Sequence, residues 1–200
     1  MSDVLVVGLT GGVATGKTTI AEIFKSLGAV IIDADKIARE IVKPNSSTWQ
    51  KIKDYFGTKI LNDDLSINRN LLGELIFSNE IHRNKLNKIT HPEIIHKIKQ
   101  EIKNAQHQIV IIDAPLLIET NMLSMVDKLI VVTASEETQI KRVMKRDNLS
   151  KESAKSRIDS QMPLSVKVKL ADFVINTDCP KIELEEKVKV VWESLKGTRE

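Results

Sequence analysis

The most constraining feature of the chain is a glycine-rich segment near its N-terminus, residues 11–18, which reads GGVATGKT. It matches the pattern G-x-x-x-x-G-K-(S/T) of a phosphate-binding P-loop. An apolar run, residues 4–9, precedes it, and residues 18–27 carry apolar side chains at helical spacing. Because glycines at a strand-to-helix turn let the backbone fold around an anion, this context favours a nucleotide-phosphate site over a plain glycine turn.

The P-loop supplies most of the predicted nucleotide contacts. Its backbone N–H groups point at phosphate oxygens, Lys17 reaches the β- and γ-phosphates, and the Thr18 hydroxyl binds Mg²⁺. The residues predicted to bind the nucleotide here are Gly12, Val13, Ala14, Thr15, Gly16, Lys17, Thr18 and Thr19. The expected ligands are therefore a nucleoside triphosphate and Mg²⁺.

Composition excludes several other classes of protein. The 200 residues suit one α/β domain with an insertion, and the net charge of +3 is too small to argue for nucleic acid. The lone Cys179 excludes an internal disulfide and a cysteine zinc site. We see no signal peptide and no apolar run near the ~18 residues of a membrane span. We expect a cytoplasmic protein with small-molecule substrates and without a membrane or obligate protein partner.

Five short apolar runs, separated by helical patterns, predict the fold. Parallel strands buried on both faces read as near-continuous Val/Ile/Leu runs, and alternation with helices indicates a doubly wound α/β sheet. Ligands bind at the carboxyl ends of such strands, where Asp33, Asp35 and Asp113 lie. The predicted strands are residues 4–9, 29–33, 108–113, 128–133 and 173–176.

Two segments interrupt this alternation. Residues 36–107 contain no convincing strand and are far longer than a simple crossover needs, which predicts a helical insertion that holds a second substrate. Its predicted helices are residues 36–42, 48–55, 69–77, 81–88 and 93–104.

The second segment, residues 139–170, is rich in Lys and Arg. A solvated helix face and an arginine-bearing lid that closes on the phosphates both explain it, and we favour the lid. Arg142 and Arg146 are four residues apart, so they share a helix face and could reach a triphosphate together.

A kinase needs a carboxylate for the acceptor hydroxyl and charges that balance the transferred phosphoryl group. Asp33 is the candidate base, whereas Asp35 directly precedes a predicted helix and is the better candidate for its N-cap. Asp113 either helps to hold Mg²⁺ or only ends its strand. The His91-Pro92 pair predicts a helix start, and His91 is either satisfied locally or catalytic.

In this order along the chain, the motifs resemble the dephospho-coenzyme A kinase family. The resemblance rests on GLTGG…GKT at residues 8–18, Asp-Ala-Asp at 33–35 with Arg39, Arg69, His-Pro at 91–92, Pro-Leu-Leu-Ile-Glu at 115–119, Lys-Arg at 141–142 with Arg-Asp at 146–147, and ADFVIN at 171–176. It covers nearly the whole chain. One departure is Ala14, where many members have glycine, which restricts φ without abolishing phosphate binding.

The resemblance implies a P-loop kinase with a five-stranded parallel sheet, which phosphorylates the ribose 3′-hydroxyl of dephospho-CoA with ATP, the last step of CoA synthesis. Asp33, Lys17 and Arg142 would be catalytic, and Arg142 and Asn176 would also bind ATP. Thr18 and Asp113 are the candidate metal ligands. The residues implied to bind dephospho-CoA are Asp33, Asp35, Arg39, Arg69, His91, Leu116 and Glu119.

Two alternatives stay open at this point. A kinase of another small metabolite, such as a nucleoside monophosphate or a sugar acid, would share the P-loop, the carboxylate and the lid. A nucleotide-dependent binding module would share the P-loop without turnover. A GTPase is disfavoured because neither Asn84-Lys85 nor Asn87-Lys88 is followed by the Asp of an N-K-x-D element.

Overall fold

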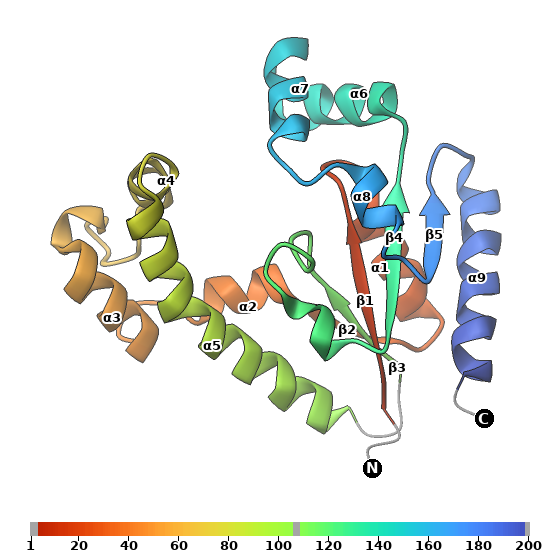
Figure 1. The fold of residues 1–200 in the computed structure, drawn as a ribbon, viewed down its shortest axis with the longest axis horizontal. Helices are drawn as coiled ribbons and strands as arrows, with labels where there is room; N and C mark the ends of the chain where they lie inside the picture. The colour runs from red at the N-terminus through yellow and green to blue at the C-terminus, as the bar shows by residue number, and fades with distance from the viewer. Residues whose placement is uncertain (1–3, 106–108, 199–200) are drawn as a thin grey trace. The chain divides into compact units, whose positions relative to one another are not determined.

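The computed structural model describes residues 4–105 and 109–198, so residues 106–108, where the predicted insertion ends and the third predicted strand begins, lie outside the described residues (Figure 1). The chain forms two compact units. One comprises the residues up to Ile32 and from Ile102 onward, and the other is Asp33–Glu101. We call them the nucleotide unit and the helical unit and describe each by itself.

A five-stranded sheet forms the centre of the nucleotide unit, in the order β2-β3-β1-β4-β5. β1 pairs in parallel with β3 and β4, and β4 pairs in parallel with β5. The predicted five-stranded parallel P-loop kinase sheet is confirmed. Its strands are β1 (Leu5–Gly11), β2 (Val30–Asp33), β3 (Ile109–Asp113), β4 (Lys128–Thr133) and β5 (Phe173–Asn176).

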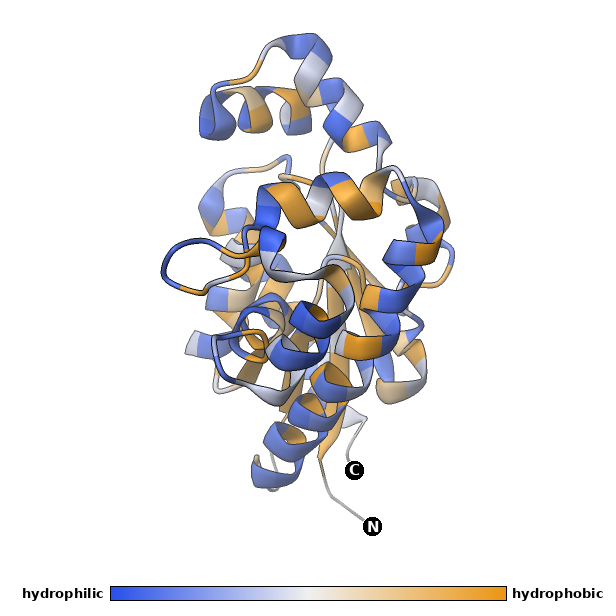
Figure 2. Cartoon of the chain, turned by 90° about the vertical axis from the view of Figure 1, so that its left-hand side faces the viewer, coloured by the Kyte–Doolittle hydropathy of each residue, from blue (hydrophilic) through white to orange (hydrophobic). Residues whose placement is uncertain are grey.

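The main core packs two helices, α1 (Lys17–Ser26) and α9 (Lys181–Gly197), against the strands. Figure 2 shows the central strands as hydrophobic and the helices as alternately hydrophobic and hydrophilic, as expected for amphipathic helices on a buried sheet. Phe24 of α1 and Trp192 of α9 meet with ring centroids 6.3 Å apart. Every residue of β1 is buried, so the strand that leads into the P-loop is rigidly held.

Short helices follow β3 and β4 in the same unit. They are η2 (Met122–Met125), α6 (Glu136–Asp147), α7 (Lys151–Asp159) and α8 (Leu164–Val168). Ser135 and Ser150 cap α6 and α7 through their hydroxyls. Ile140, Val143 and Ala154 form a small core of their own, on which Val13 and Ala14 of the P-loop also pack. Part of the predicted lid is thus in contact with the P-loop.

The helical unit has its own small core of Ile52, Ile60 and Leu72. The Trp49 indole, buried beside it, donates a hydrogen bond to the Leu65 carbonyl at 2.8 Å. The elements are α2 (Ala34–Glu40), α3 (Ser47–Phe56), η1 (Thr58–Ile60), α4 (Arg69–Phe77) and α5 (Glu80–Asn104), whose last residues continue into the other unit.

The predicted helix break before Pro92 is wrong, because α5 is one helix of 25 residues with Pro92 inside it. A proline in a helix interior loses one backbone hydrogen bond and crowds the preceding turn. Packing of the helix before and after Pro92 offsets that cost. Ile89 packs on the core of the helical unit, and Ile98 is fully buried.

No helix in the described part of the chain is long and apolar enough to cross a membrane.

Candidate active site

The P-loop presents an uncapped helix N-terminus. Gly16 is the N-cap of α1 and has φ 91°. No side chain makes a capping hydrogen bond there, and the first turn of α1 contains no acidic residue. Helices leave their first N–H groups without intrahelical partners, and these groups with the helix dipole attract anions. Thr15 closes the loop internally, since its hydroxyl donates to the Gly12 carbonyl at 3.0 Å. The described residues therefore form a cradle for phosphate.

Gly11 of the loop leaves no room for a side chain, and Gly12 is closely packed against the Gln139 side chain. A Cβ on Gly11 would lie 2.6 Å from the Val132 carbonyl oxygen and 2.7 Å from the Thr15 hydroxyl. A Cβ on Gly12 would lie 2.9 Å from Gln139 Oε1. Glycines suit these positions because the loop backbone packs closely against β4 and α6.

Ala14 adopts the left-handed region, with φ 57°. An L-residue pays about 1 kcal/mol or more there. The contacts around it hold this geometry, because the Ala14 carbonyl accepts from Arg142 Nη1 at 3.2 Å and its methyl packs on the small core of α6 and α7. The departure from glycine is therefore accommodated by the neighbouring helix.

Lys17 and Asp113 form an ion pair between the first turn of α1 and the end of β3. The register of β1 and β3 places Leu9 opposite Asp113, which brings the strand end under the loop. Both side chains are largely buried, with 15% and 13% exposed. The structure thus brings together the predicted phosphate lysine and the predicted metal carboxylate.

Arg142 links α6 to the P-loop and to the turn after β5. Its guanidinium donates to the Thr177 hydroxyl at 2.9 Å and to the Thr177 carbonyl at 3.2 Å. The Thr177 hydroxyl in turn donates to the Thr15 carbonyl at 2.7 Å. Thr177 was missed at the sequence level, because a lone threonine after a strand carries no motif.

Arg146 does not join Arg142. Its guanidinium donates to both carboxylate oxygens of Asp147, which also accepts from Arg157. The hydrogen bond from Arg146, with the charges of both arginines, holds the pKa of Asp147 below its usual value. Helical spacing alone predicts that the two arginines share one face of the helix. The Asp147 carboxylate, however, holds the Arg146 guanidinium.

Asp33 ends β2 and caps α2, accepting from the Lys36 N–H at 2.8 Å through Oδ1. The expectation that Asp35 is the better capping candidate is wrong, because α2 begins at Ala34 and Asp35 lies in its first turn. Asp33 is exposed, as is Asn176 at the end of β5, where Asn176 Oδ1 accepts from the Asp178 N–H at 2.8 Å.

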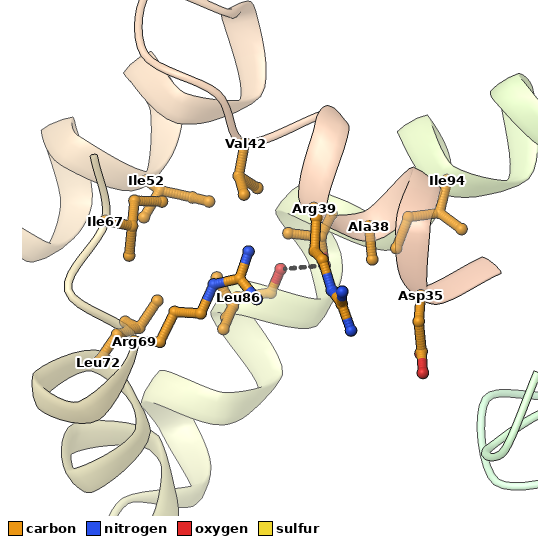
Figure 3. Close-up of a pocket in the computed structure, with 11 residues that line it drawn as sticks. Asp35, Ala38, Arg39, Val42, Ile52, Ile67, Arg69, Leu72, Leu86 and Ile94 are labelled. Carbon is orange, nitrogen blue, oxygen red and sulfur yellow. Dashed lines mark hydrogen bonds between the residues drawn. The ribbon is translucent and has the colours of Figure 1, made fainter. Parts of the chain in front are cut away.

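The helical unit contains a pocket of about 370 Å³ (Figure 3). Arg39 of α2 and Arg69 of α4 line it together with Asp35 and apolar side chains. Within the described residues, neither guanidinium has a hydrogen bond or an ion pair. The only hydrogen bond drawn there joins the Thr90 hydroxyl to the Leu86 carbonyl. Two uncompensated cations over an apolar floor suit a ligand with both anionic and apolar parts.

The remaining predicted acceptor residues differ in their surroundings. His91 is partly buried on α5, and this burial lowers the pKa of its imidazole. Leu116 is exposed in the turn after β3. Both carboxylate oxygens of Glu119 are buried, and Oε1 lies 2.8 Å from Lys167 Nζ. Lys167 was expected only as one basic residue of the lid, and its burial was not visible from sequence.

The residues fit Mg²⁺ only as part of a nucleotide complex. The described residues hold no group of three or more His, Cys, Asp or Glu side chains that could bind a metal by themselves. Mg²⁺ commonly takes one or two protein ligands and completes its shell with phosphates and water. The Thr18 hydroxyl and the Asp113 carboxylate, which pairs with Lys17, are the candidate protein ligands.

A parallel sheet with a P-loop after its first strand, a carboxylate at the end of β3 and an arginine from α6 defines a P-loop kinase. The family model described as dephospho-CoA kinase matches residues 5–182. The chain belongs to this family.

Individual proteins are similar to nearly the whole chain. A dephospho-CoA kinase from Lactobacillus acidophilus is 47% identical over 187 residues, which cover 92% of this chain and 94% of the relative. A solved dephospho-CoA kinase from Campylobacter jejuni is 32% identical with a TM-score of 0.63, covering 97% of this chain and 98% of that one. A solved protein from Thermus thermophilus, TT1252, is 27% identical with a TM-score of 0.86, covering 96% of this chain and 97% of that one.

Proposed function

We propose that the chain transfers the γ-phosphoryl group of ATP to the ribose 3′-hydroxyl of dephospho-CoA and so makes CoA. The family match over residues 5–182 carries the choice of acceptor. The uncapped N-terminus of α1 beside the Lys17–Asp113 pair supports the choice of a triphosphate donor.

Asp33 is proposed as the general base. The 3′-hydroxyl oxygen attacks the γ-phosphorus, the bond to the β,γ-bridging oxygen breaks, ADP leaves, and the hydroxyl proton passes to the carboxylate. Asp33 Oδ1 is fixed by the Lys36 N–H, which orients the carboxylate and leaves Oδ2 for the hydroxyl. The cap thus serves to position the base.

The P-loop residues 12–19 would hold the triphosphate, with Lys17 and Arg142 opposing its charge and Asn176 near the adenine. Mg²⁺ bound with ATP supplies further charge neutralisation, and Thr18 and Asp113 are the residues that would hold it. Lys17 would exchange part of its contact with Asp113 for phosphate oxygens. The support for these assignments is the cradle geometry and the ion pair.

The acceptor is proposed to use the pocket of the helical unit. Dephospho-CoA combines a diphosphate with an uncharged arm, and Arg39 and Arg69, which have no partner among the described residues, line this pocket together with apolar side chains. Asp35 lines the same pocket. Contacts from His91 and Leu116 stay predictions, as does a cytoplasmic location. The contact from Glu119, whose carboxylate oxygens are buried, also stays a prediction.

The decisive experiment measures ADP release from Mg·ATP with and without dephospho-CoA, and confirms the product by mass. Stimulated release with the gain of one phosphate on dephospho-CoA is expected. ATP binding without stimulation would contradict the acceptor assignment. A panel of nucleoside monophosphates and sugar acids would then test the other kinases, and no transfer to any acceptor would favour a binding module.

A further inference from the structure

One lysine of the nucleotide unit is fully buried. Lys167, in the short helix α8, has 0% of its side chain exposed. Its ammonium donates to the Pro115 carbonyl at 3.0 Å and to the Gly11 carbonyl at 3.4 Å. It also forms an ion pair with Glu119 Oε1 at 2.8 Å, which is a charge contact without hydrogen-bond alignment.

Burial of this kind is costly unless the charges compensate each other. An ammonium removed from water loses several kcal/mol of solvation in general, and so does a carboxylate. The Glu119 carboxylate oxygens have no hydrogen-bond donor within the described residues. Lys167 is therefore the charge partner of this carboxylate. An apolar pair would be cheaper at this position, which suggests that the lysine is kept for the two carbonyls that it holds.

Those two carbonyls belong to the parts of the chain that carry the phosphate site. Gly11 ends β1 and begins the P-loop. Pro115 follows Asp113 by two residues, and its carbonyl also accepts from the Thr10 hydroxyl at 3.0 Å. The intervening Ala114 N–H donates to the Leu9 carbonyl at 3.1 Å. The Lys167 ammonium therefore clamps the end of β1 to the end of β3, next to the Lys17–Asp113 ion pair.

We propose that Lys167 and Glu119 are a positioning pair for phosphoryl transfer, a role that rests on the proposed function. Lys167 fixes the peptide groups at Gly11 and Pro115, and Glu119 fixes and neutralises the ammonium. The pair sets where Lys17 and Asp113 meet the triphosphate without touching it. A misplacement of catalytic groups by about 1 Å can cost on the order of 100-fold in rate.

The test compares Lys167→Met with the double variant Lys167→Met/Glu119→Leu. The single variant leaves a buried carboxylate without its cation and should lose stability. The double variant removes both buried charges, and its unfolding midpoint in urea should recover toward the wild type. The expected kcat of the double variant stays on the order of 10- to 100-fold below the wild type, because both carbonyls lose the ammonium that joins them. KM for dephospho-CoA should change little.

Lys189→Met is the matched control, because Lys189 is an exposed lysine of α9, outside the predicted lid. It should keep the wild-type kcat and urea midpoint. Recovery of both stability and kcat in the double variant would overturn the proposal and leave a purely structural pair. So would a full kcat in Lys167→Met, or a failure of both Lys167 variants to fold.

A second measurement separates this inference from the proposed function. Hydrogen exchange of the free protein should be faster in the double variant at residues 11–17 and 113–119, and unchanged in the core helix α9. A wild-type protein without transfer to dephospho-CoA would contradict the proposed function alone. Unchanged exchange in both segments would contradict the positioning role alone.

Discussion

At the scale of single residues, Asp33 combines two duties in one carboxylate. It caps α2 through Oδ1 and is the proposed base for the acceptor hydroxyl. Both duties could be suspected from the sequence, because Asp is a favoured N-cap and the strand end is where ligands bind. The sequence pattern predicted Asp35 as the N-cap, because the pattern does not define the first residue of the helix.

Asp33→Asn separates these duties. Asn is as good an N-cap as Asp, so the fold and the affinity for an ATP analogue should stay at the wild-type level. Loss of a general base should lower kcat about 100-fold or more. Steady-state kinetics and calorimetric titration measure the two effects. Asp64→Asn, at an exposed turn of the same unit, is the control, and a kcat near the wild type in Asp33→Asn would remove Asp33 from the mechanism.

Lys17→Ala tests the P-loop assignment. The substitution removes the ion pair with Asp113 and the charge expected at the phosphates. ATP-analogue affinity and kcat should both fall by about tenfold or more, since a charge-assisted contact contributes roughly 1.5–3 kcal/mol. Circular dichroism should show an intact fold. Lys25→Ala, in the exposed last turn of α1, is the control, and equal behaviour of the two variants would contradict the assignment.

At the scale of elements, α5 shows how packing decides a helix boundary. Pro92 predicted a helix start, yet the helix runs through it from Glu80 to Asn104. His91 is therefore held within a continuous helix, where partial burial lowers the pKa of its imidazole from 6.5. Desolvation disfavours the protonated ring, so folding favours the neutral form.

His91 should make stability depend on pH in a definite direction. Because the folded pKa lies below the unfolded pKa, the contribution is complete above pH 6.5 and is lost as pH falls through the folded pKa. In urea titrations from pH 7.5 to 5, His91→Gln should flatten the loss of unfolding free energy. His96→Gln, at an exposed site on the same helix, should not. Identical pH profiles for His91→Gln and the wild type would contradict this explanation.

The segment from α6 to α8 is the predicted lid. Its surface ion pairs, such as that between Lys155 and Glu136, contribute little to stability. Arg142 nevertheless contacts the P-loop directly. A non-hydrolysable ATP analogue should slow hydrogen exchange across residues 139–169, because phosphates would recruit this segment, and should leave α9 unchanged. Equal exchange with and without the analogue would leave the segment as a solvated surface.

At the scale of the whole molecule, the chain divides into a nucleotide unit and a contiguous helical unit. A ligand that binds only the folded chain stabilises it by an amount set by its concentration. An ATP analogue at 100 times its Kd should raise the unfolding free energy by about 2.7 kcal/mol. Urea unfolding with and without the analogue measures this. At the same analogue concentration a tenfold weaker affinity should reduce the increase to about 1.4 kcal/mol in Lys17→Ala, and an unreduced increase there would place the nucleotide elsewhere.

The architecture and the chemical class of the protein could be predicted from the amino-acid sequence alone. Local patterns sufficed for this, because continuous apolar runs, a glycine-rich turn and the helices between them are properties of neighbouring residues. The P-loop and all five strands lie where these patterns placed them, apart from ends shifted by up to two residues and Gln108, which lies outside the described residues. Ordered motifs spread over the chain were enough to indicate the family.

Which side chains meet depends on the folded structure. The Arg142–Thr177–Thr15 network and the buried Lys167–Glu119 pair join residues far apart in sequence, and no local pattern encodes such contacts. The same holds for Arg146, which Asp147 turns away from Arg142. The free energy of a buried charge depends on all the groups that pack around it. The sequence could therefore show that lysines and arginines were present, and folding decided which one was placed in the interior behind the P-loop.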